Sequence, residues 1–195
     1  MNYKTIKNLF FAERYKECLN ICKKLLKSEP ENALAWKYAG KSLFALADYV
    51  KAKECQARAH QLNRDDPEII KDMGDILNAL NEKEAASQCY EQAIKTSKDY
   101  APAIFKLAVL KKTLGNLEDA LYLFKRCLEV DKQLTLAYVG AAECFLTLGD
   151  FTQAESFAIE ALKLNRIAPA ANEILGIIYQ NNNNLKKPLS ITRGN

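Results

Sequence analysis

The sequence predicts an all-α protein in which pairs of antiparallel helices stack into a solenoid. Within residues 115–129, apolar side chains recur at the spacing of one helical face. The same plan returns 34 residues later, at 149–163, and at the same step towards the N-terminus. A fixed period without insertions is typical of proteins that grow by stacking repeats. The 195 residues include only 7 Gly and 5 Pro, which suits long helices joined by short turns.

The period divides the chain into repeats that begin at equivalent residues. Ala33, Pro67, Ala101, Thr135 and Pro169 are each 34 residues apart, and repeat positions are counted from them. The residues before Ala33 form an incomplete first repeat that begins at position 3. The predicted domain covers residues 1–180, with repeats at 1–32, 33–66, 67–100, 101–134 and 135–168 and a partial repeat at 169–180. Residues 181–195 are predicted to be a polar, flexible tail.

Three positions of the repeat carry mostly small residues. Two antiparallel helices approach closely only where facing side chains are small, so these positions predict the contact between the helices. They are position 8 (Ile6, Gly40, Gly74, Ala108, Ala142 and Gly176), position 20 (Cys18, Ala52, Ala86, Ala120 and Ala154) and position 27 (Leu25, Ala59, Ala93, Cys127 and Ala161).

Each repeat is predicted to contain a helix A, a short turn and a helix B. Gly115 and Gly149 can adopt the left-handed conformation that ends helix A, and Asp48 and Asp150 can cap the helix B that follows. Helices A are expected at 35–46, 69–80, 103–114, 137–148 and 171–180. Helices B are expected at 15–28, 51–62, 85–96, 119–130 and 153–164.

This pattern resembles the tetratricopeptide repeat family, whose repeat runs W-x2-L-G-x2-Y, then A-x3-F, then P. The matching residues are Trp36, Ala39, Gly40, Leu43 and Ala52, then Ile104, Leu107, Ala108, Ala120 and Phe124, then Tyr138, Ala141, Ala142, Phe145 and Ala154. The chain departs from the family at Gln56, which stands in the usual aromatic position, and at the terminal proline, which is present only as Pro30. The resemblance covers about residues 3–180 and implies a right-handed α-α superhelix of five helix pairs plus one trailing helix.

The charge of the chain argues against a nucleic-acid partner. The net charge is +4, but residues 1–30 hold seven basic and three acidic side chains and residues 181–195 hold three basic ones. The middle of the chain is therefore net negative, whereas a nucleic-acid-binding protein usually has a continuous basic face. No stretch approaches the length of a membrane span, and the apolar run Leu9–Ala12 is too short for a signal peptide.

The cysteines are expected to be reduced and mostly buried. Cys127 occupies a position that alanine holds in other repeats, and a free cysteine behaves as a small apolar residue. Cys55 and Cys89 are one repeat apart, which places them about 10 Å from each other and too far for a disulfide. This usage suits a reducing compartment, so we expect a cytoplasmic protein. The six cysteines are Cys18, Cys22, Cys55, Cys89, Cys127 and Cys144.

Motifs for chemistry are incomplete, so we expect no enzyme, no cofactor and no metal. Residues 35–42 resemble a phosphate-binding loop, but Ala35 occupies the first glycine position and the segment falls inside a helix. Cys18 and Cys22 lie four residues apart, a spacing that could give zinc two ligands, but no further Cys or His completes the set nearby. With His60 as the single histidine and no G-x-S-x-G run, a nucleophilic site lacks its usual parts.

The resemblance implies that helices A line a concave groove that binds a peptide or a helix. The candidate groove residues are Lys37, Tyr38, Lys41, Asp72, Asp75, Phe105, Lys106, Val109, Val139 and Glu143. Along the chain the groove changes from basic and aromatic to acidic and then to apolar, which would fix the direction of a bound segment. A solvated face without a ligand is the alternative. A clamp for a C-terminal carboxylate, found in one subclass of the family, is not expected because Asp72 would repel the carboxylate.

The expected function is a non-catalytic scaffold or adaptor that binds a segment of a protein partner. A second hypothesis is the substrate-recruiting arm of a larger transferase, of glycosyl- or sulfotransferase type, with the catalytic domain absent from this chain. The predicted last helix, 171–180, is apolar on more than one side and has no helix B after it. Because a terminal repeat normally has a polar outer face, this helix is a candidate for self-association.

Overall fold

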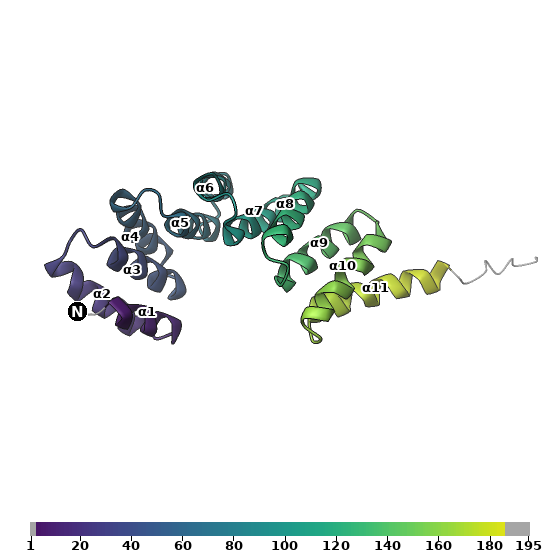
Figure 1. Ribbon diagram of the computed structural model, residues 1–195, viewed down its shortest axis with the longest axis horizontal. Coiled ribbons are helices and arrows are strands. Elements are labelled where there is room, and N and C mark those ends of the chain that lie inside the picture. The colour runs from purple at the N-terminus through teal and green to yellow at the C-terminus, as the bar shows by residue number, and fades with distance from the viewer. Residues whose placement is uncertain (1–2, 186–195) are drawn as a thin grey trace, which may run out of the picture. The chain divides into compact units, whose positions relative to one another are not determined.

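The computed structural model describes residues 3–185, and all regular structure in that range is α-helical. Residues 186–195, most of the predicted tail, lie outside the described residues. The chain divides into two compact units, Met1–Leu107 and Ala108–Asn195. Figure 1 labels the helices, which are α1 (Tyr3–Phe11), α2 (Tyr15–Ser28), α3 (Ala33–Ala45), α4 (Tyr49–Leu62), α5 (Pro67–Ala79), α6 (Lys83–Thr96), α7 (Ala101–Thr113), α8 (Leu117–Val130), α9 (Thr135–Thr147), α10 (Phe151–Leu164) and α11 (Pro169–Leu185).

Most of the predicted helices begin two residues earlier than expected, and in four of them, α3, α4, α5 and α10, the side chain of a polar residue caps the first turn. The side chain of Asn32 accepts a hydrogen bond from a backbone N–H of α3, and Asp66 does the same for α5, where Pro67 occupies the first turn. The predicted caps are confirmed: the side chains of Asp48 and Asp150 accept from the first turns of α4 and α10.

The turns between helix A and helix B use the left-handed backbone conformation. Gly115 and Gly149 have φ of +81° and +80°, as predicted. The other three turns place non-glycine residues there, namely Glu13, Ala47 and Asn81, with φ between 58° and 64°. The turn is therefore set by the repeat, and glycine relieves its strain in two of five cases.

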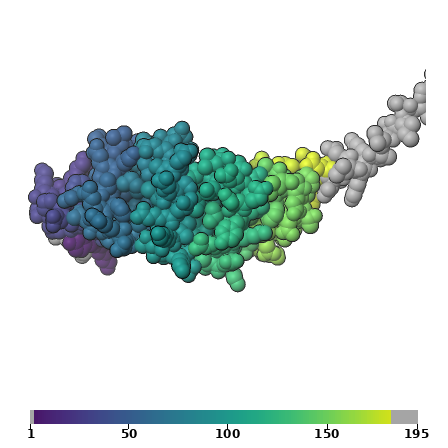
Figure 2. Space-filling view, turned by 90° about the horizontal axis from the view of Figure 1, so that it is seen from above, coloured from purple at the N-terminus to yellow at the C-terminus, as the bar shows by residue number. Residues whose placement is uncertain are grey.

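Unit 1 contains α1 to α6 and the first half of α7. From α1 to α6 each helix packs against the next, and α3 also contacts α1 and α5, the helices A on either side of it. Figure 2 shows the side chains of these helices following one another in chain order, from purple to teal. One core cluster of unit 1 consists of Ile6, Cys18, Leu19, Cys22, Leu25, Ala35, Tyr38, Ala39, Leu43, Ala52 and Ile76.

Small residues allow close contact between helices, as predicted. A Cβ atom at Gly74 would lie 2.6 Å from the ring of Tyr90, which sits on helix B of the same repeat. At Gly40 the equivalent neighbour is Gln56, with its Oε1 atom 2.7 Å away. The alanines at positions 20 and 27 are completely buried in the described repeats. In these two repeats, a large side chain of helix B therefore packs directly against a glycine of helix A.

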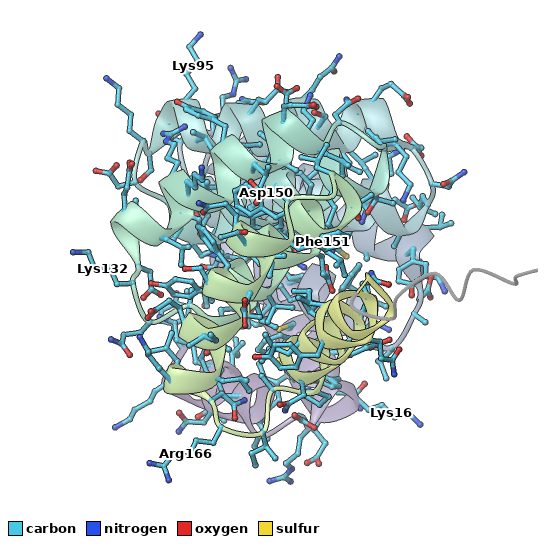
Figure 3. All side chains as sticks on the ribbon, turned by 90° about the vertical axis from the view of Figure 1, so that its right-hand side faces the viewer. Lys16, Lys95, Lys132, Asp150, Phe151 and Arg166 are labelled. Carbon is cyan, nitrogen blue, oxygen red and sulfur yellow. The ribbon has the colours of Figure 1, made fainter. Side chains whose placement is uncertain are left out.

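Unit 2 contains the end of α7 and α8 to α11. Phe124 of α8 is fully buried, and a Cβ atom at Gly140 of α9 would lie 2.4 Å from its ring. The residues that replace the family proline, Lys132 and Arg166, are exposed and point outward from the turns after α8 and α10 (Figure 3). A basic residue is tolerated there because its side chain is in solvent.

The last helix is longer than predicted. It continues to Leu185, whereas the sequence indicated an end at residue 180 and a tail from 181. Asparagine is only a moderate helix former, but neither glycine nor proline interrupts the sequence between Gly176 and Pro188. Within the described residues, no helix is both long enough and apolar enough to cross a membrane.

We predict that Gly74→Ala will lower the free energy of unfolding by about 1–3 kcal/mol, because the added methyl group overlaps the ring of Tyr90. The matched control is Gly176→Ala, the same change at the same repeat position of α11. Its Cβ atom would meet no described atom within 4 Å, so this variant should be neutral or more stable by up to about 1 kcal/mol. Urea denaturation followed by circular dichroism measures both. Equal effects of the two substitutions would contradict the assigned helix register.

Candidate functional site

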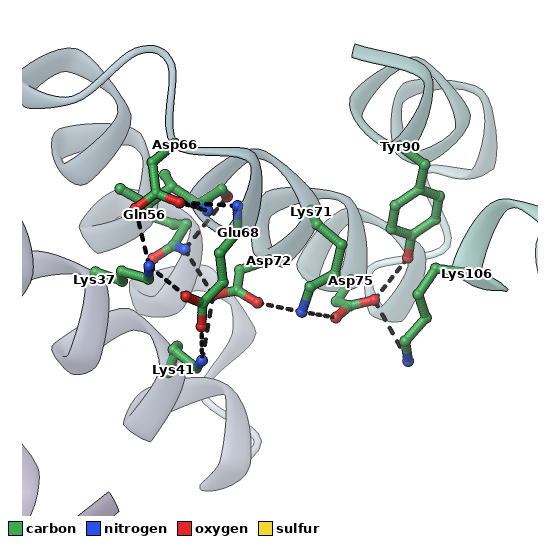
Figure 4. A network of polar contacts seen from close by, with 11 residues as sticks. Lys37, Lys41, Gln56, Asp66, Glu68, Lys71, Asp72, Asp75, Tyr90 and Lys106 are labelled. Atoms are coloured by element: carbon green, nitrogen blue, oxygen red, sulfur yellow. Dashed lines mark hydrogen bonds and ion pairs between the residues drawn. The ribbon is translucent and has the colours of Figure 1, made fainter. Parts of the chain in front are cut away.

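The helices A of unit 1 carry a network of ion pairs on one face (Figure 4). We call the face formed by α1, α3, α5 and residues 101–107 of α7 the helix-A face. Its ion-pair network contains four lysines and four carboxylates on neighbouring helices, which are Lys37, Lys41, Lys71, Lys106, Asp66, Glu68, Asp72 and Asp75.

The first part of the network joins α3 to the start of α5. The Nζ atom of Lys37 lies 2.9 Å from Asp66 Oδ2 and 2.6 Å from Glu68 Oε2. Lys41, one turn further along α3, pairs with the other oxygen of Glu68 and lies 3.8 Å from Asp72 Oδ2. Glu68 is therefore held between two lysines of the preceding repeat.

The second part of the network runs along α5 towards α7. Lys71 pairs with Asp72 and with Asp75, the latter at 3.0 Å. The buried Gln56 donates a hydrogen bond of 3.2 Å from Nε2 to Asp72 Oδ2. The Asp75 Oδ1 atom accepts a hydrogen bond of 2.9 Å from the hydroxyl of Tyr90 and lies 3.6 Å from Lys106 Nζ. Each carboxylate is thus paired with at least one cation.

The electrostatics of the network differ between its carboxylates. Burial raises the pKa of Glu68, but hydrogen bonds from Lys37 and Lys41 outweigh this and lower its pKa to about 2. Asp72 is only 7% exposed, and its burial raises its pKa above the usual value despite the opposing effect of Lys71 and Lys41. The lysines therefore stabilise the ionised form of Glu68 more than burial destabilises it. For Asp72 the cost of burying the ionised carboxylate is larger than this stabilisation.

A small pocket opens beside the network. It has a volume of about 200 Å³ and combines apolar walls with charged groups. The Nζ atom of Lys41 lies 5.0 Å from the ring centre of Phe10, within range of a cation–π contact. The lining residues are Phe10, Phe44, Ala45 and Ile76 on the apolar side and Lys41, Lys71, Asp72 and Asp75 on the charged side.

Sequence reasoning missed Phe10 on the apolar side of this pocket. Phe10 was not considered because the first repeat is incomplete and its helix A was not among those predicted. A signal was present, since Phe10 and Phe44 both occupy position 12 of their repeats. In the structure these two residues lie on α1 and α3 and both line the pocket.

The predicted groove residues do not all lie at the surface. Tyr38 is 5% exposed, with its ring 5.5 Å from that of Phe10 in the core, and Val139 of unit 2 is 8% exposed. Phe105 and Val109 are half-buried. In unit 2, Glu143 forms an ion pair with Lys112. The structure thus brings Lys37, Lys41, Asp72, Asp75 and Lys106 together in unit 1.

The charge gradient expected along the groove takes a different form in the structure. The basic residues of α3 and the acidic residues of α5 face each other and form pairs. The change of sign between consecutive repeats therefore links the repeats to each other. This pairing leaves the side chain of Lys106, which is 45% exposed, as the network's most accessible cation.

Groups for chemistry are sparse in the described part of the chain. There, no cluster of three or more His, Cys, Asp or Glu residues could hold a metal ion. The six cysteines form no disulfide, and four of them are buried. Gly40, in the segment that resembles a phosphate-binding loop, lies inside α3, where the backbone N–H groups serve the helix.

We predict that Glu68→Gln will lower the free energy of unfolding by about 1 kcal/mol at pH 7, a modest value because the carboxylate is about a third exposed to solvent. A depressed folded pKa stabilises the fold above the ordinary value of 4.5, and this contribution is lost as the pH falls towards 2. The difference between wild type and variant should therefore shrink across that window, as measured by urea denaturation at several pH values. Glu129→Gln, at an exposed position of α8, is the control. A difference that stays constant down to pH 2 would contradict the pairing.

The arrangement of helices matches solved structures over most of the chain. A crystal structure of MamA has a TM-score of 0.73 at 20% identity and covers 83% of this chain and 94% of its own. YrrB, titled a TPR protein with an unusual peptide-binding site, has a TM-score of 0.70 at 18% identity and covers 88% of both chains. A thermophilic TPR protein from Thermus thermophilus has a TM-score of 0.73 at 16% identity and covers 91% of this chain and 96% of its own.

The sequence comparisons agree with the structural ones. A comparison with curated protein sequences finds no match. A family model described as the tetratricopeptide repeat matches residues 72–100, 101–134 and 136–167. These segments follow the 34-residue period, and the solved structures share the all-helical fold. The chain therefore contains three tetratricopeptide repeats within residues 72–167 and has the fold of tetratricopeptide repeat proteins.

Proposed function

We propose that the protein is a non-catalytic scaffold that binds a peptide segment of a partner protein on the helix-A face of unit 1. The observation that carries this proposal is the pocket between Phe10, Phe44 and Ile76. It has apolar walls, a charged rim and room for one side chain. Such a combination suits recognition of a peptide, in which an apolar side chain supplies affinity and polar groups at the rim supply orientation.

The paired charges of the network support an apolar anchor over a charged one. Lys41 and Lys71 already contact carboxylates, so a charged ligand group would have to compete with existing ion pairs. An apolar side chain would instead cover the faces of two aromatic rings without breaking a pair. Burial of such a side chain contributes about 1.5–3 kcal/mol. The network also holds the rim in a fixed geometry, which reduces the entropy cost of binding.

Lys106 is the residue of the predicted groove best placed to contact the rest of a bound peptide. Its side chain is 45% exposed and lies beside Asp75, which also lines the pocket. A carboxylate or carbonyl group of a peptide seated in the pocket could reach this ammonium group from solvent. The peptide would then place an apolar side chain in the pocket and a polar or negatively charged group next to Lys106.

The comparisons support the kind of ligand rather than the place where it binds. YrrB is titled a TPR protein with a peptide-binding site, and it shares the fold with this chain at 18% identity. Repeats of this family present their A helices as a continuous face, and the pocket of unit 1 lies on such a face. A peptide ligand is therefore the class that we assign to this protein.

We predict that Phe44→Ser will weaken binding of peptides selected from a random phage-displayed library by about tenfold or more, because it removes one wall of the pocket. The control is Val50→Ser on α4, which removes an apolar side chain that is 63% exposed and does not line the pocket. Fluorescence anisotropy gives the dissociation constants, and circular dichroism verifies the fold of both variants. Selected peptides that bind Phe44→Ser as tightly as wild type would refute the pocket as the site, and a library without any enriched peptide would refute the proposal itself.

A further inference from the structure

The last helix, α11, lacks the partner that other helices A have. In the described part of the chain, α3, α5 and α9 are each followed by a helix B that packs on them, whereas α11 contacts only α9 and α10. Position 8 faces helix B at Gly40 and Gly74, and position 11 does so at Phe145, whose ring centre lies 5.4 Å from that of Phe157. Together with the adjoining position 7, these positions are Leu175, Gly176 and Tyr179 in α11. We call these three residues the open face of α11.

Most of the equivalent residues in the complete repeats are buried. At position 11, Leu43 and Leu77 are 6% exposed and Phe145 is 8% exposed, whereas Tyr179 is 49% exposed. At position 7, Ala39, Leu107 and Ala141 are buried, whereas Leu175 is half-buried, as is Met73 of α5. The open face therefore consists of residues of the kind that helix B buries in complete repeats, but in α11 they are accessible to solvent.

The surroundings of Gly176 indicate which kind of side chain a helix packed on α11 would place there. At Gly40 and Gly74, the same repeat position, the space next to the Cα atom is filled by a side chain from helix B, Gln56 or Tyr90. At Gly176 no described atom lies within 4 Å of where a Cβ atom would be. The hollow into which helix B inserts a large side chain is thus present in α11 and empty among the described residues.

We propose that the open face of α11 binds an amphipathic α-helix from another polypeptide, which takes the place of a helix B. The covering helices of this chain define its chemistry. In α6, Tyr90 seats on a glycine, and Ala86 and Ala93, about one turn before and after it, are completely buried. The partner helix should likewise carry an aromatic residue with a small residue about one turn away on each side. It would continue the interface that helix A and helix B form in each complete repeat.

A helix from a different protein fits this face better than a second copy of the chain. The helices B of a second copy are already packed on their own A helices, as the burial of Ala52, Ala86, Ala154 and Ala161 shows. Freeing one of them would require a repeat to open. The hydroxyl of Tyr179 donates a hydrogen bond of 2.9 Å to Glu155 of α10, which fixes the ring along the edge of the open face. The face is therefore already formed before a partner arrives.

The test uses a fluorescent peptide with the sequence of α6, residues 83–96, as a helix B supplied in trans. A lactam bridge between the side chains of Glu91 and Lys95, both exposed in α6, holds the peptide helical. Its matched control is the same peptide with Tyr90→Ala. The protein is the full chain as wild type, as Gly176→Ala, and as Asn181→Ala, an exposed position of α11 outside the open face.

We expect the peptide to bind wild type and Asn181→Ala equally and Gly176→Ala at least tenfold more weakly, as measured by fluorescence anisotropy. The Tyr90→Ala peptide should lose affinity to a similar extent. The added methyl group leaves the isolated helix intact, so loss of binding without loss of thermal stability separates docking from folding. Equal affinity for Gly176→Ala, or no binding to wild type, would overturn the proposal. Self-association of wild type that Gly176→Ala abolishes, measured by sedimentation, would assign the face to a second copy and overturn it too.

Discussion

The structure depends on the contact between a large side chain of helix B and a residue of helix A that has no side chain. Tyr90 against Gly74 and Phe124 against Gly140 are the clearest cases, because a Cβ atom at either glycine would overlap the ring. Close approach at these points brings the alanines of positions 20 and 27 into full burial. The core of each repeat therefore consists largely of close contacts between small side chains. Much of the stability of a repeat comes from its interfaces with the neighbouring repeats.

This packing decides how the helix-A face is used. Stacking repeats at a fixed period brings equivalent turns of α3 and α5 next to each other, so that lysines of one meet carboxylates of the next. The ion-pair network then joins neighbouring repeats along the same face that could bind a partner. What the network leaves accessible is the aromatic pocket and the half-exposed Lys106. In the proposed function, stability and recognition share one surface, and the ion pairs that join the repeats restrict which groups remain for a partner.

The sequence alone was enough to predict the repeat, the helix pairs and the turn residues. Gly115 and Gly149 in the left-handed conformation and Asp48 and Asp150 as caps depend on local chemistry, which a sequence displays. The pairing of Lys37 and Lys41 with Glu68 was missed, because it depends on how neighbouring helices are rotated. The burial of Tyr38 has the same origin. The sequence did show that lysines at positions 5 and 9 of one repeat are followed by acidic residues in the next. We interpreted this change of charge as a feature that orients a ligand, whereas in the structure the opposite charges pair with each other.

The measurement that tests this account most directly is amide hydrogen exchange of the full chain, followed by mass spectrometry. The helices α9 and α11 are both helices A that contact the helix B before them, but in the described structure only α9 also has the helix B of its own repeat packed on it. If helix B supplies most of the stability of a helix A, amides of α11 should exchange faster than those of α9. Equal protection of the two helices would contradict the central role of this contact.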